Sequence, residues 1–568
     1  MSDVSIVLCG EAGQGIQTVE LLFSKIVHKQ GLYIFSTKEY MSRVRGGSNS
    51  TLIRISTRPV KAYNDRIDLF IPLTSEAITH LKERINEDTI IIGDKTILEN
   101  IKKHKTFEAN FKENARSIGN PLLTNVIAVG MLSSLCDIPI KNVQTEITAF
   151  FSDKKDEIIK KNITAVQKGY NLGDKLKRDG LRSFNIATSK RKEETILING
   201  TQAIGLGAIA GGCNFISSYP MSPATGVLTF LSKHAEDFNI IVEQAEDEIS
   251  AINMALGAWY AGARSLVTTS GGGYALMIEG ISLAGMIESP VVVHVAQRPG
   301  PATGLPTRTE QADLEHILYS GHGEFPRILY APGTLEDAFH LTLKAFHLAD
   351  KYQIPVFVLS DQYFVDSYYQ MDMPKTDSIE YKQYFIKTKK DYKRYNLTED
   401  GLSPRGIPGY GEGLLCVDSD EHDQEGCITE DMDTRKKMVE KRLRKTLAFE
   451  KEIIPPEFTG SNDYRYLVIG WGSTYHIINE ALLRINNKKI GFLHFKQLYP
   501  LHKTISEYLN KAETTIIIEN NATSQFAKLI KQETGTTIDH HILQYNSLPF
   551  SVETIESELR KIIKKEVV

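Results

Sequence analysis

Short apolar, β-branched segments alternate with amphipathic helical segments along most of this 568-residue chain. In one stretch the apolar segments read NFISSYP, SLVTTS, VVVHVAQ and PVFVLSD. Strands of a parallel sheet that is covered by helices on both faces have this composition. The alternation therefore predicts an α/β fold.

The pattern restarts twice, which predicts three α/β domains and a long excursion between the last two. A basic stretch, SKRKEET at 189–195, is typical of a linker. A charged stretch that contains SPRGIPGYGEG predicts an irregular arm followed by the helix TRKKMVEKRLRKTLAF. A loop of that length inside a compact protein usually serves function or an interface. The predicted parts are 1–188, 196–375, the arm 376–460, and 461–568.

Composition excludes several classes of protein. The formal net charge is −4, so nothing predicts a nucleic-acid or anionic-membrane partner. The N-terminus lacks the features of a signal peptide, and no apolar run reaches the roughly 18–20 residues that span a bilayer. Five scattered cysteines without a CxxC pair indicate a reduced, cytoplasmic protein with no zinc or iron–sulfur site of its own, and no metal site is expected in this chain.

A glycine-rich turn, GEAGQG, follows the first strand and precedes the helical run IQTVELLFSKIVHK. Gly10, Gly13 and Gly15 would let a phosphate approach the start of that helix, although a tight packing turn explains them as well. The spacing is not GxGxxG and no ribose-binding acid follows, which excludes a nicotinamide-dependent dehydrogenase. Arg43 and Arg45 in SRVRGG are further candidates for phosphate, or an ordinary solvated pair.

Acidic residues crowd the start of the helical segment VEQAEDEISAINMALGAWYAGA. Acids at a helix N-terminus are favoured by the helix dipole, which accounts for one or two of them. Glu246 and Glu248 are two residues apart and face different directions. One acid can therefore point into a closed site while its neighbours stay in solvent.

Two loops after predicted strands contain further candidates. TTSGGGYALMIEGI places three glycines between a strand and a helix, where backbone can approach a ligand or simply turn a corner. VAQRPGPATGLPTRTEQADL contains Arg298, Thr303, Thr307 and Arg308 among prolines. An arginine fork with nearby hydroxyls suits a carboxylate substrate, and a rigid surface loop is the alternative.

Taken together and in order, SYPMSPATG, QAEDEISA, TSGGGYALM and QRPGPATGLPT resemble the 2-oxoacid:ferredoxin oxidoreductase family. The resemblance is to the α subunit with a γ domain fused at its N-terminus, and it covers nearly the whole chain. It implies a γ-type domain, a thiamine diphosphate-binding domain of the pyrimidine type, and a transketolase C-terminal-like domain. It also implies oxidative decarboxylation of a 2-oxoacid to an acyl-CoA, with electrons passed to ferredoxin.

The resemblance also assigns roles to residues. Glu248 matches the carboxylate that holds the cofactor's pyrimidine ring, with Tyr219 and Pro220 beside the cofactor. Ser222 stands where the family usually has threonine, and its hydroxyl would orient the oxoacid.

Within the same resemblance, Arg298 would pair with the carboxylate of the substrate. Thr303 and Thr307 match positions that line the same pocket. These three residues and Ser222 form the substrate site that the resemblance implies.

The family's diphosphate–Mg²⁺ motif and cluster cysteines are absent from this sequence, since GDK at 93–95 and 173–175 lacks the pattern. The resemblance therefore implies a separate β subunit that carries Mg²⁺ and a [4Fe–4S] cluster, in an (αβ)₂ assembly. The chain alone would be inactive, with thiamine diphosphate shared between the subunits and coenzyme A as co-substrate.

The substrate stays open at this point. The fused organisation favours 2-oxoglutarate, with Arg308 a candidate for its distal carboxylate, while pyruvate and branched-chain oxoacids are alternatives. A non-catalytic nucleotide-binding subunit is a second kind of alternative, which the set of Glu248, Ser222 and Arg298 disfavours.

Overall fold

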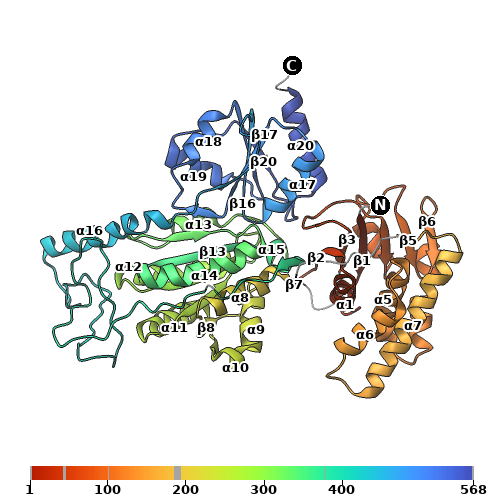
Figure 1. The fold of residues 1–568 in the computed structure, drawn as a ribbon, viewed down its shortest axis with the longest axis horizontal. Coiled ribbons are helices and arrows are strands. Elements are labelled where there is room, and N and C mark those ends of the chain that lie inside the picture. Colours follow the sequence, from red (N-terminus) through yellow and green to blue (C-terminus); the bar gives the residue numbers. More distant parts are fainter. Residues whose placement is uncertain (1–2, 43–46, 100, 185–193, 378, 566–568) are drawn as a thin grey trace. The chain divides into compact units, whose positions relative to one another are not determined.

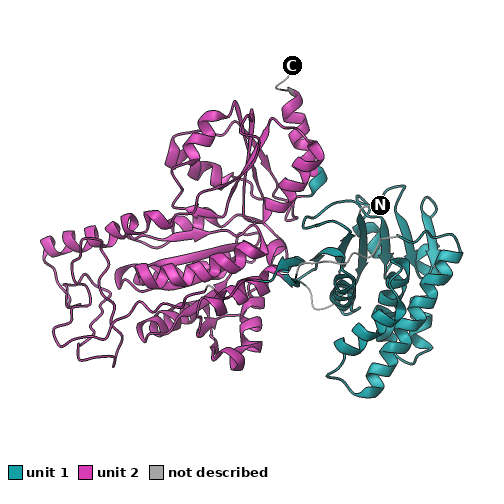
Figure 2. Cartoon of the chain, in the orientation of Figure 1, with its two compact units in different colours: residues 1–198, 366–373, 551–553 teal, residues 199–365, 374–550, 554–568 magenta. Residues whose placement is uncertain are grey.

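The computed structural model describes residues 3–42, 47–99, 101–184, 194–377 and 379–565. It divides the chain into two compact units, coloured separately in Figure 2. The first unit comprises 1–198 together with 366–373 and 551–553, and the second comprises the rest. The predicted parts 196–375 and 461–568 thus each give a short segment to the first unit. Residues 189–193 of the predicted linker lie outside the described residues.

The first unit is built on an eight-stranded sheet in the order β6-β5-β4-β1-β3-β2-β14-β7. β1 pairs antiparallel with β3 and parallel with β4, and β14 pairs antiparallel with β2, with Tyr368 opposite Ser36. The strands are β1 (Asp3–Gly10), β2 (Tyr33–Glu39), β3 (Asn49–Ser56), β4 (Leu69–Pro72), β5 (Ile90–Gly93), β6 (Lys105–Glu108), β7 (Thr195–Asn199) and β14 (Tyr368–Asp372).

Helices of the first unit bury an apolar face against this sheet. Along α1 the buried side chains include Leu22, Phe23 and Ile26, spaced to lie on one side of the helix. The helices are α1 (Ile16–Lys29), α2 (Glu76–His80), α3 (Lys95–Leu98), α4 (Phe111–Arg116), α5 (Thr124–Leu135), α6 (Ile140–Phe150) and α7 (Asp156–Arg178), with a 3₁₀ turn at Pro121–Leu123.

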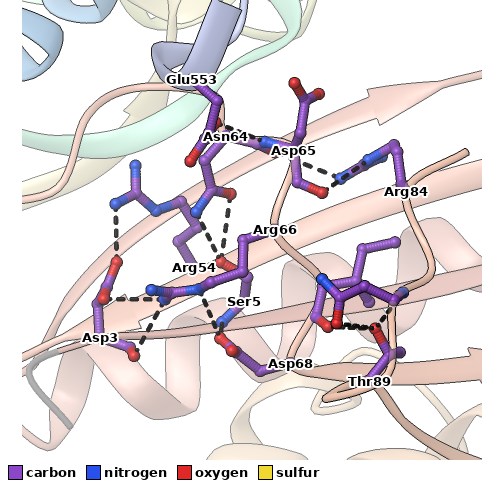
Figure 3. Close-up of polar contacts among 12 residues, drawn as sticks. Asp3, Ser5, Arg54, Asn64, Asp65, Arg66, Asp68, Arg84, Thr89 and Glu553 are labelled. Atoms are coloured by element: carbon purple, nitrogen blue, oxygen red, sulfur yellow. Dashed lines mark hydrogen bonds and ion pairs between the residues drawn. The ribbon is translucent and has the colours of Figure 1, made fainter. Parts of the chain in front are cut away.

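A polar network ties the edges of β1, β3 and β4 together, as Figure 3 shows. Arg54 of β3 is buried and donates to Asp3 at 2.8 Å and to the Ala62 carbonyl at 2.6 Å. Burial acts to raise the pKa of Asp3, but Arg54 and Arg66 lower it overall. Residues 551–553 join the same network, since the Asp65 N–H donates to Glu553 at 2.9 Å. Buried charges of this kind persist because each has a partner.

The second unit contains a seven-stranded sheet in the order β18-β12-β13-β11-β10-β8-β9, parallel except where β18 meets β12. The four strands predicted from NFISSYP, SLVTTS, VVVHVAQ and PVFVLSD are β8, β10, β11 and β13. The strands are β8 (Phe215–Ser218), β9 (Ile241–Gln244), β10 (Ser265–Thr269), β11 (Val291–Gln297), β12 (Ile328–Tyr330), β13 (Pro355–Asp361) and β18 (Gln497–Tyr499).

Helices follow these strands, as Figure 1 shows. Residues 228–238, LTFLSKHAEDF, belong to two helices, because the chain turns at His234 between α9 and α10. The helices are α8 (Gly200–Ala210), α9 (Thr225–Lys233), α10 (Ala235–Phe238), α11 (Glu248–Tyr260), α12 (Gly271–Met286), α13 (Leu314–Tyr319), α14 (Leu335–Tyr352) and α15 (Gln362–Asp366). None of the helices in the described part of the chain is long and apolar enough to cross a membrane.

A five-stranded sheet in the order β15-β17-β16-β19-β20 completes the second unit. Its strands are β15 (Glu457–Gly460), β16 (Tyr466–Trp471), β17 (Ile490–Phe495), β19 (Thr514–Glu519) and β20 (His540–Leu543). Its helices are α17 (Tyr475–Ile485), α18 (Ile505–Lys511), α19 (Gln525–Thr534) and α20 (Val552–Lys565).

The arm predicted at 376–460 is largely irregular up to α16 (Met432–Ala448), the helix expected there. Buried ion pairs hold it to the rest of the second unit. Lys441 and Lys445 of α16 each contact Glu288 at 2.6 Å, and Asp350 pairs with Arg264 at 2.9 Å and with Arg405 of the arm. Because an unpaired buried charge is costly, these pairs fix where the arm docks.

Candidate functional site

The candidate site lies where parallel strands of the seven-stranded sheet end. In this sheet β10 lies between β8 and β11. The carboxyl ends of these strands are followed by the segments 219–224 (after β8), 270–273 (after β10) and 298–313 (after β11). Ligands of parallel α/β sheets bind at this edge, because the loops from neighbouring strands converge there. The sheet therefore gathers the motifs that were singled out in the sequence.

Glu248 is the first residue of α11 and is buried, with 3 % of its surface exposed. The preceding Asp247 caps the helix by accepting from the Ser250 N–H at 2.7 Å, which leaves Glu248 free to turn inward. Its Oε1 is buried without a hydrogen-bond partner among the described residues. Burial raises the pKa of the Glu248 carboxyl, Asp247 adds to the rise, and Arg298 opposes it.

The glycines of TSGGG make room for two carboxylates at the start of α12. A Cβ on Gly273 would lie 2.5 Å from Oε1 of Glu248, and one on Gly271 would lie 2.4 Å from both carboxylate oxygens of Asp313. Real Cβ atoms do not approach other atoms so closely, so a side chain at either position would displace the carboxylate beside it. The adjoining Ser270 hydroxyl is also buried without a partner in the described structure.

Arg298 follows β11 and reaches the turn that contains Ser222. Its Nη1 donates to the main-chain oxygen of Ser222 at 2.6 Å, while its Nε is buried and has no partner within the described ranges. Partial burial lowers the pKa of Arg298, and the charges of Asp313 and Glu248 oppose that effect. The guanidinium is thus anchored through Nη1, while its Nε lacks an acceptor among the described residues.

The remaining predicted site residues surround this group with different exposure. Ser222, Tyr219 and Thr303 are exposed, Pro220 is half-buried, and Thr307 is buried. The carbonyl of Ala302 would lie 3.6 Å from a Cβ on Gly272, so the loop that carries Thr303 passes beside the glycine turn.

Residues of the C-terminal sheet clamp the segment that follows this loop. Gln311 is fully buried, its side-chain amide donates to the Trp471 carbonyl at 3.0 Å, and its backbone N–H donates to the Asn520 carbonyl at 2.7 Å. The Asn521 side chain donates to the Gln311 carbonyl at 3.1 Å. The C-terminal sheet therefore positions the loop between Arg298 and Asp313.

The first unit has a cavity of its own at the GEAGQG turn. It measures about 420 Å³ and is lined in part by Gly13, Gly15, Phe111, Lys112 and Arg116. Gly10 ends β1 just before it, and the positions Arg43 and Arg45 lie outside the described residues. The cavity offers two cations and apolar surface beside the start of α1, which suits a phosphorylated ligand with an apolar part.

Two family models match the chain. Residues 5–172 match the one described as "Pyruvate ferredoxin/flavodoxin oxidoreductase". Residues 206–441 match the one described as "Pyruvate flavodoxin/ferredoxin oxidoreductase, thiamine diP-bdg". The chain is 30 % identical over 626 residues to the 2-oxoacid:ferredoxin oxidoreductase subunit alpha of Sulfolobus sp, covering 99 % of this chain and 97 % of that one.

This chain belongs to the 2-oxoacid:ferredoxin oxidoreductase family. It is an alpha subunit with the two matched domains, as its motifs predicted, and the prediction of an α/β fold is also confirmed. A similar solved structure is "2-oxoglutarate:ferredoxin oxidoreductase from Magnetococcus marinus with 2-oxoglutarate, coenzyme A and succinyl-CoA bound". Its TM-score is 0.91 and its identity 29 %, over 99 % of this chain and all of that one.

A second relative is the 2-oxoglutarate oxidoreductase subunit KorA of Mycobacterium tuberculosis. It is 31 % identical over 422 residues, which cover 72 % of this chain and 63 % of that relative.

Two residues of the candidate site were missed in the sequence. Asp313 and Gln297 were not singled out, although the Asp313 N–H donates to the buried Gln297 side chain at 2.9 Å. The acid in QADL was the available signal, but nothing in the local pattern separates it from a solvated loop residue. The position of Asp313 in the site becomes visible from its carboxylate, which lies where a Cβ on Gly271 would be.

Proposed function

We propose that this chain supplies the pyrimidine-binding half of a thiamine diphosphate site for the oxidative decarboxylation of a 2-oxoacid to an acyl-CoA. The observation that supports this most is the buried, unpartnered Oε1 of Glu248 against Gly273. An orphaned buried carboxylate oxygen is costly unless a ligand supplies a donor. A protonated nitrogen of the cofactor's pyrimidine ring is such a donor.

When bound, thiamine diphosphate supplies a carbon nucleophile for the 2-oxo group and an electron sink for loss of CO₂. Glu248 would hold its pyrimidine ring and keep the proton at the ring nitrogen. Tyr219 and Pro220, in the exposed turn after β8, are proposed to line the cofactor beside it. Burial of Glu248 strengthens such a hydrogen bond, because little water competes for it.

The residues of this chain would also orient the substrate. Arg298 presents an unpartnered Nε, to which a carboxylate can bind while Nη1 keeps its bond to Ser222. The exposed Ser222 hydroxyl is proposed to hydrogen-bond the oxoacid, with Thr303 and Thr307 lining the pocket. Fixing the substrate in this way lowers the entropic part of the barrier.

The site is proposed to be completed by a β subunit that carries Mg²⁺ and a [4Fe–4S] cluster and passes electrons to ferredoxin, in an (αβ)₂ assembly. The two helices that contribute Glu248 and Gly273, α11 and α12, support an interface. They expose large apolar side chains, namely Ile249, Met254, Tyr260 and Leu276. Apolar surface of this kind on a charged protein marks a protein interface.

Coenzyme A is proposed to bind the first unit at the cavity beside Gly13 and Gly15. Lys112 and Arg116 would pair with its phosphates, and Phe111 and Leu122 offer an apolar wall. Gly10 and the positions 43 and 45 belong to the same proposal.

The favoured substrate is 2-oxoglutarate, and pyruvate and branched-chain oxoacids are the alternatives. Support comes from the similar Magnetococcus marinus 2-oxoglutarate:ferredoxin oxidoreductase, whose structure has 2-oxoglutarate bound, and from the relative called 2-oxoglutarate oxidoreductase. Arg308 remains the candidate for the distal carboxylate.

The test is a Glu248→Gln variant in the complex reconstituted with a β subunit. CoA-dependent viologen reduction is followed anaerobically with 2-oxoglutarate, pyruvate and 2-oxoisovalerate. We expect the wild-type complex to reduce viologen with one oxoacid preferred and the variant to lose roughly 100-fold or more in kcat. Retention of bound thiamine diphosphate and an unchanged melting temperature would show that the complex is intact. Unchanged decarboxylation in E248Q would refute the assignment.

A further inference from the structure

Asp313 faces the candidate site but has no role in the function proposed above. It follows the Arg298 loop directly before α13, and its Oδ2 is buried without a hydrogen-bond partner in the described structure. Its backbone is fixed by the bond from its N–H to Gln297, and its carboxylate fills the space that glycine leaves at position 271. The carboxylate is therefore held in place by packing while one oxygen stays unsatisfied.

Arg298 and Asp313 each have one buried atom without a hydrogen-bond partner among the described residues, and the two atoms are of opposite kind. Nε of Arg298 is a buried donor without an acceptor, and Oδ2 of Asp313 is a buried acceptor without a donor. Arg298 and Asp313 influence each other electrostatically, yet they form no ion pair within 4.0 Å. A substrate carboxylate that binds Arg298 would accept from Nε with one oxygen. Its other oxygen can meet Asp313 only if a proton lies between the two acids.

We propose that protonated Asp313 hydrogen-bonds the carboxylate of the 2-oxoacid that Arg298 binds, so that substrate binding takes up one proton. The inference rests on the proposed substrate role of Arg298. Two carboxylates beside one guanidinium would otherwise repel each other. Asp313 then positions the substrate and takes no proton from the reacting atoms.

The charges around Asp313 agree with proton uptake. Burial raises the pKa of Asp313 to about 6, Arg298 opposes the rise, and Glu310 of the same loop adds to it. Across the site Glu248 of α11 acts on Arg298, and α12 approaches the Asp313 carboxylate at Gly271, which has no side chain. His316, one turn further along, packs against Tyr274, and burial lowers its pKa. From the C-terminal part of the unit, Gln525 and Asn521 hydrogen-bond this segment, and Lys528 of α19 pairs with Glu315 of α13 at 3.0 Å.

The test compares the wild-type complex with Asp313→Asn, whose amide is neutral and keeps a donor. KM of the preferred oxoacid is measured from pH 5.5 to 8.5. For the wild type we expect KM to be flat below about pH 6 and to rise about tenfold per pH unit above it, because Asp313 must then be protonated to bind. For D313N we expect a flat KM that is about tenfold or more below the wild-type value at pH 8, with kcat within about threefold.

A second variant separates this proton from other titrations. Glu310→Gln removes the like charge that faces Asp313, so the break in the KM profile should move to lower pH and remain. A purely structural role for Asp313 would change kcat and KM at every pH without altering the slope. A D313N profile that keeps the wild-type slope would overturn the proposal.

A measurement without turnover completes the test. Oxamate, which mimics a 2-oxoacid but cannot decarboxylate, is titrated calorimetrically into the wild-type complex in two buffers of different ionisation enthalpy at pH 7.5. Uptake of close to one proton supports the proposal, and binding without proton uptake refutes it. If the proposed function itself is wrong, the complex will neither turn over an oxoacid nor bind oxamate.

Discussion

At the scale of single residues, the site depends on glycine positions where neighbouring side chains fill the space that a Cβ atom would need. Gly273 lies against Glu248, whereas the adjacent Gly272 has only ordinary contact distances around it. Neither residue has a positive φ, so backbone strain plays no part. Alanine substitutions at Gly272 and Gly273 therefore add the same methyl group, once with room for it and once without.

We expect Gly273→Ala to displace the Glu248 carboxylate, because the new Cβ would lie 2.5 Å from Oε1 and 2.2 Å from the Thr269 hydroxyl. Overpacking of this kind costs about 1–3 kcal/mol, and activity of the reconstituted complex should fall by about tenfold or more. Gly272→Ala is the matched control and should keep activity and melting temperature. Equal effects of the two variants would contradict the close approach described here.

The same residues show how far the sequence could predict the site. Glu248 was identified by its match to a family motif, and its inward direction is explained by the cap that Asp247 provides. Asp313 could not be found in this way, because a single acid in a polar loop has no local signal. Its burial arises from Gly271, 42 positions earlier, and from the clamp on Gln311, neither of which a local pattern contains.

At the scale of elements, β11 carries a buried histidine between two hydroxyl groups. His294 contacts Thr268 of β10 and Ser360 of β13, each at 2.8 Å. Burial lowers its pKa to about 3, so the imidazole stays neutral in the folded sheet at pH values where an unfolded chain would protonate it.

This neutral histidine predicts a pH-dependent loss of stability. Below about pH 6.5 the unfolded state gains a proton that folded His294 does not, so the free energy of unfolding falls by about 1.4 kcal/mol per pH unit. By pH 5 the loss from this residue is about 2 kcal/mol. Urea unfolding at pH 7 and pH 5 of the wild type and His294→Gln measures it, and the variant should lose less on acidification.

The two tryptophans, Trp259 and Trp471, both lie in the second unit, so their fluorescence follows that unit. Carboxylates that titrate in this range contribute equally to both proteins and cancel in the comparison. Identical losses of stability in the two proteins would mean that His294 is not held neutral.

Strand prediction succeeded where a segment is buried on both faces and failed where pairing is distant in sequence. β10, β11 and β13 are entirely buried, and their composition alone indicates this. β14, by contrast, reads YYQMD and pairs with β2, more than 330 positions earlier. Nothing local to 368–372 indicates that partner, so the predicted domain boundary at 375 could not separate these residues from the second unit.

At the scale of the whole molecule, we propose that the chain carries only part of the chemistry that its family performs. Glu248 and Arg298 lie at the edge of the seven-stranded sheet, and α11, which begins at Glu248, exposes large apolar side chains, as does α12. A site that is completed by a second subunit needs both features together. Binding of that subunit would cover the apolar surface and close the site with the same contact.

A charge placed on this surface should prevent assembly without unfolding the chain. Met254 of α11 is 39 % exposed, so Met254→Glu adds little cost to the folded chain alone but would bury a carboxylate in the proposed interface. We expect M254E to lose co-purification with the β subunit and to keep the wild-type melting temperature. Leu483→Glu on α17, at a position that is 79 % exposed, is the matched control and should still assemble. Assembly of M254E at wild-type affinity would place the interface elsewhere.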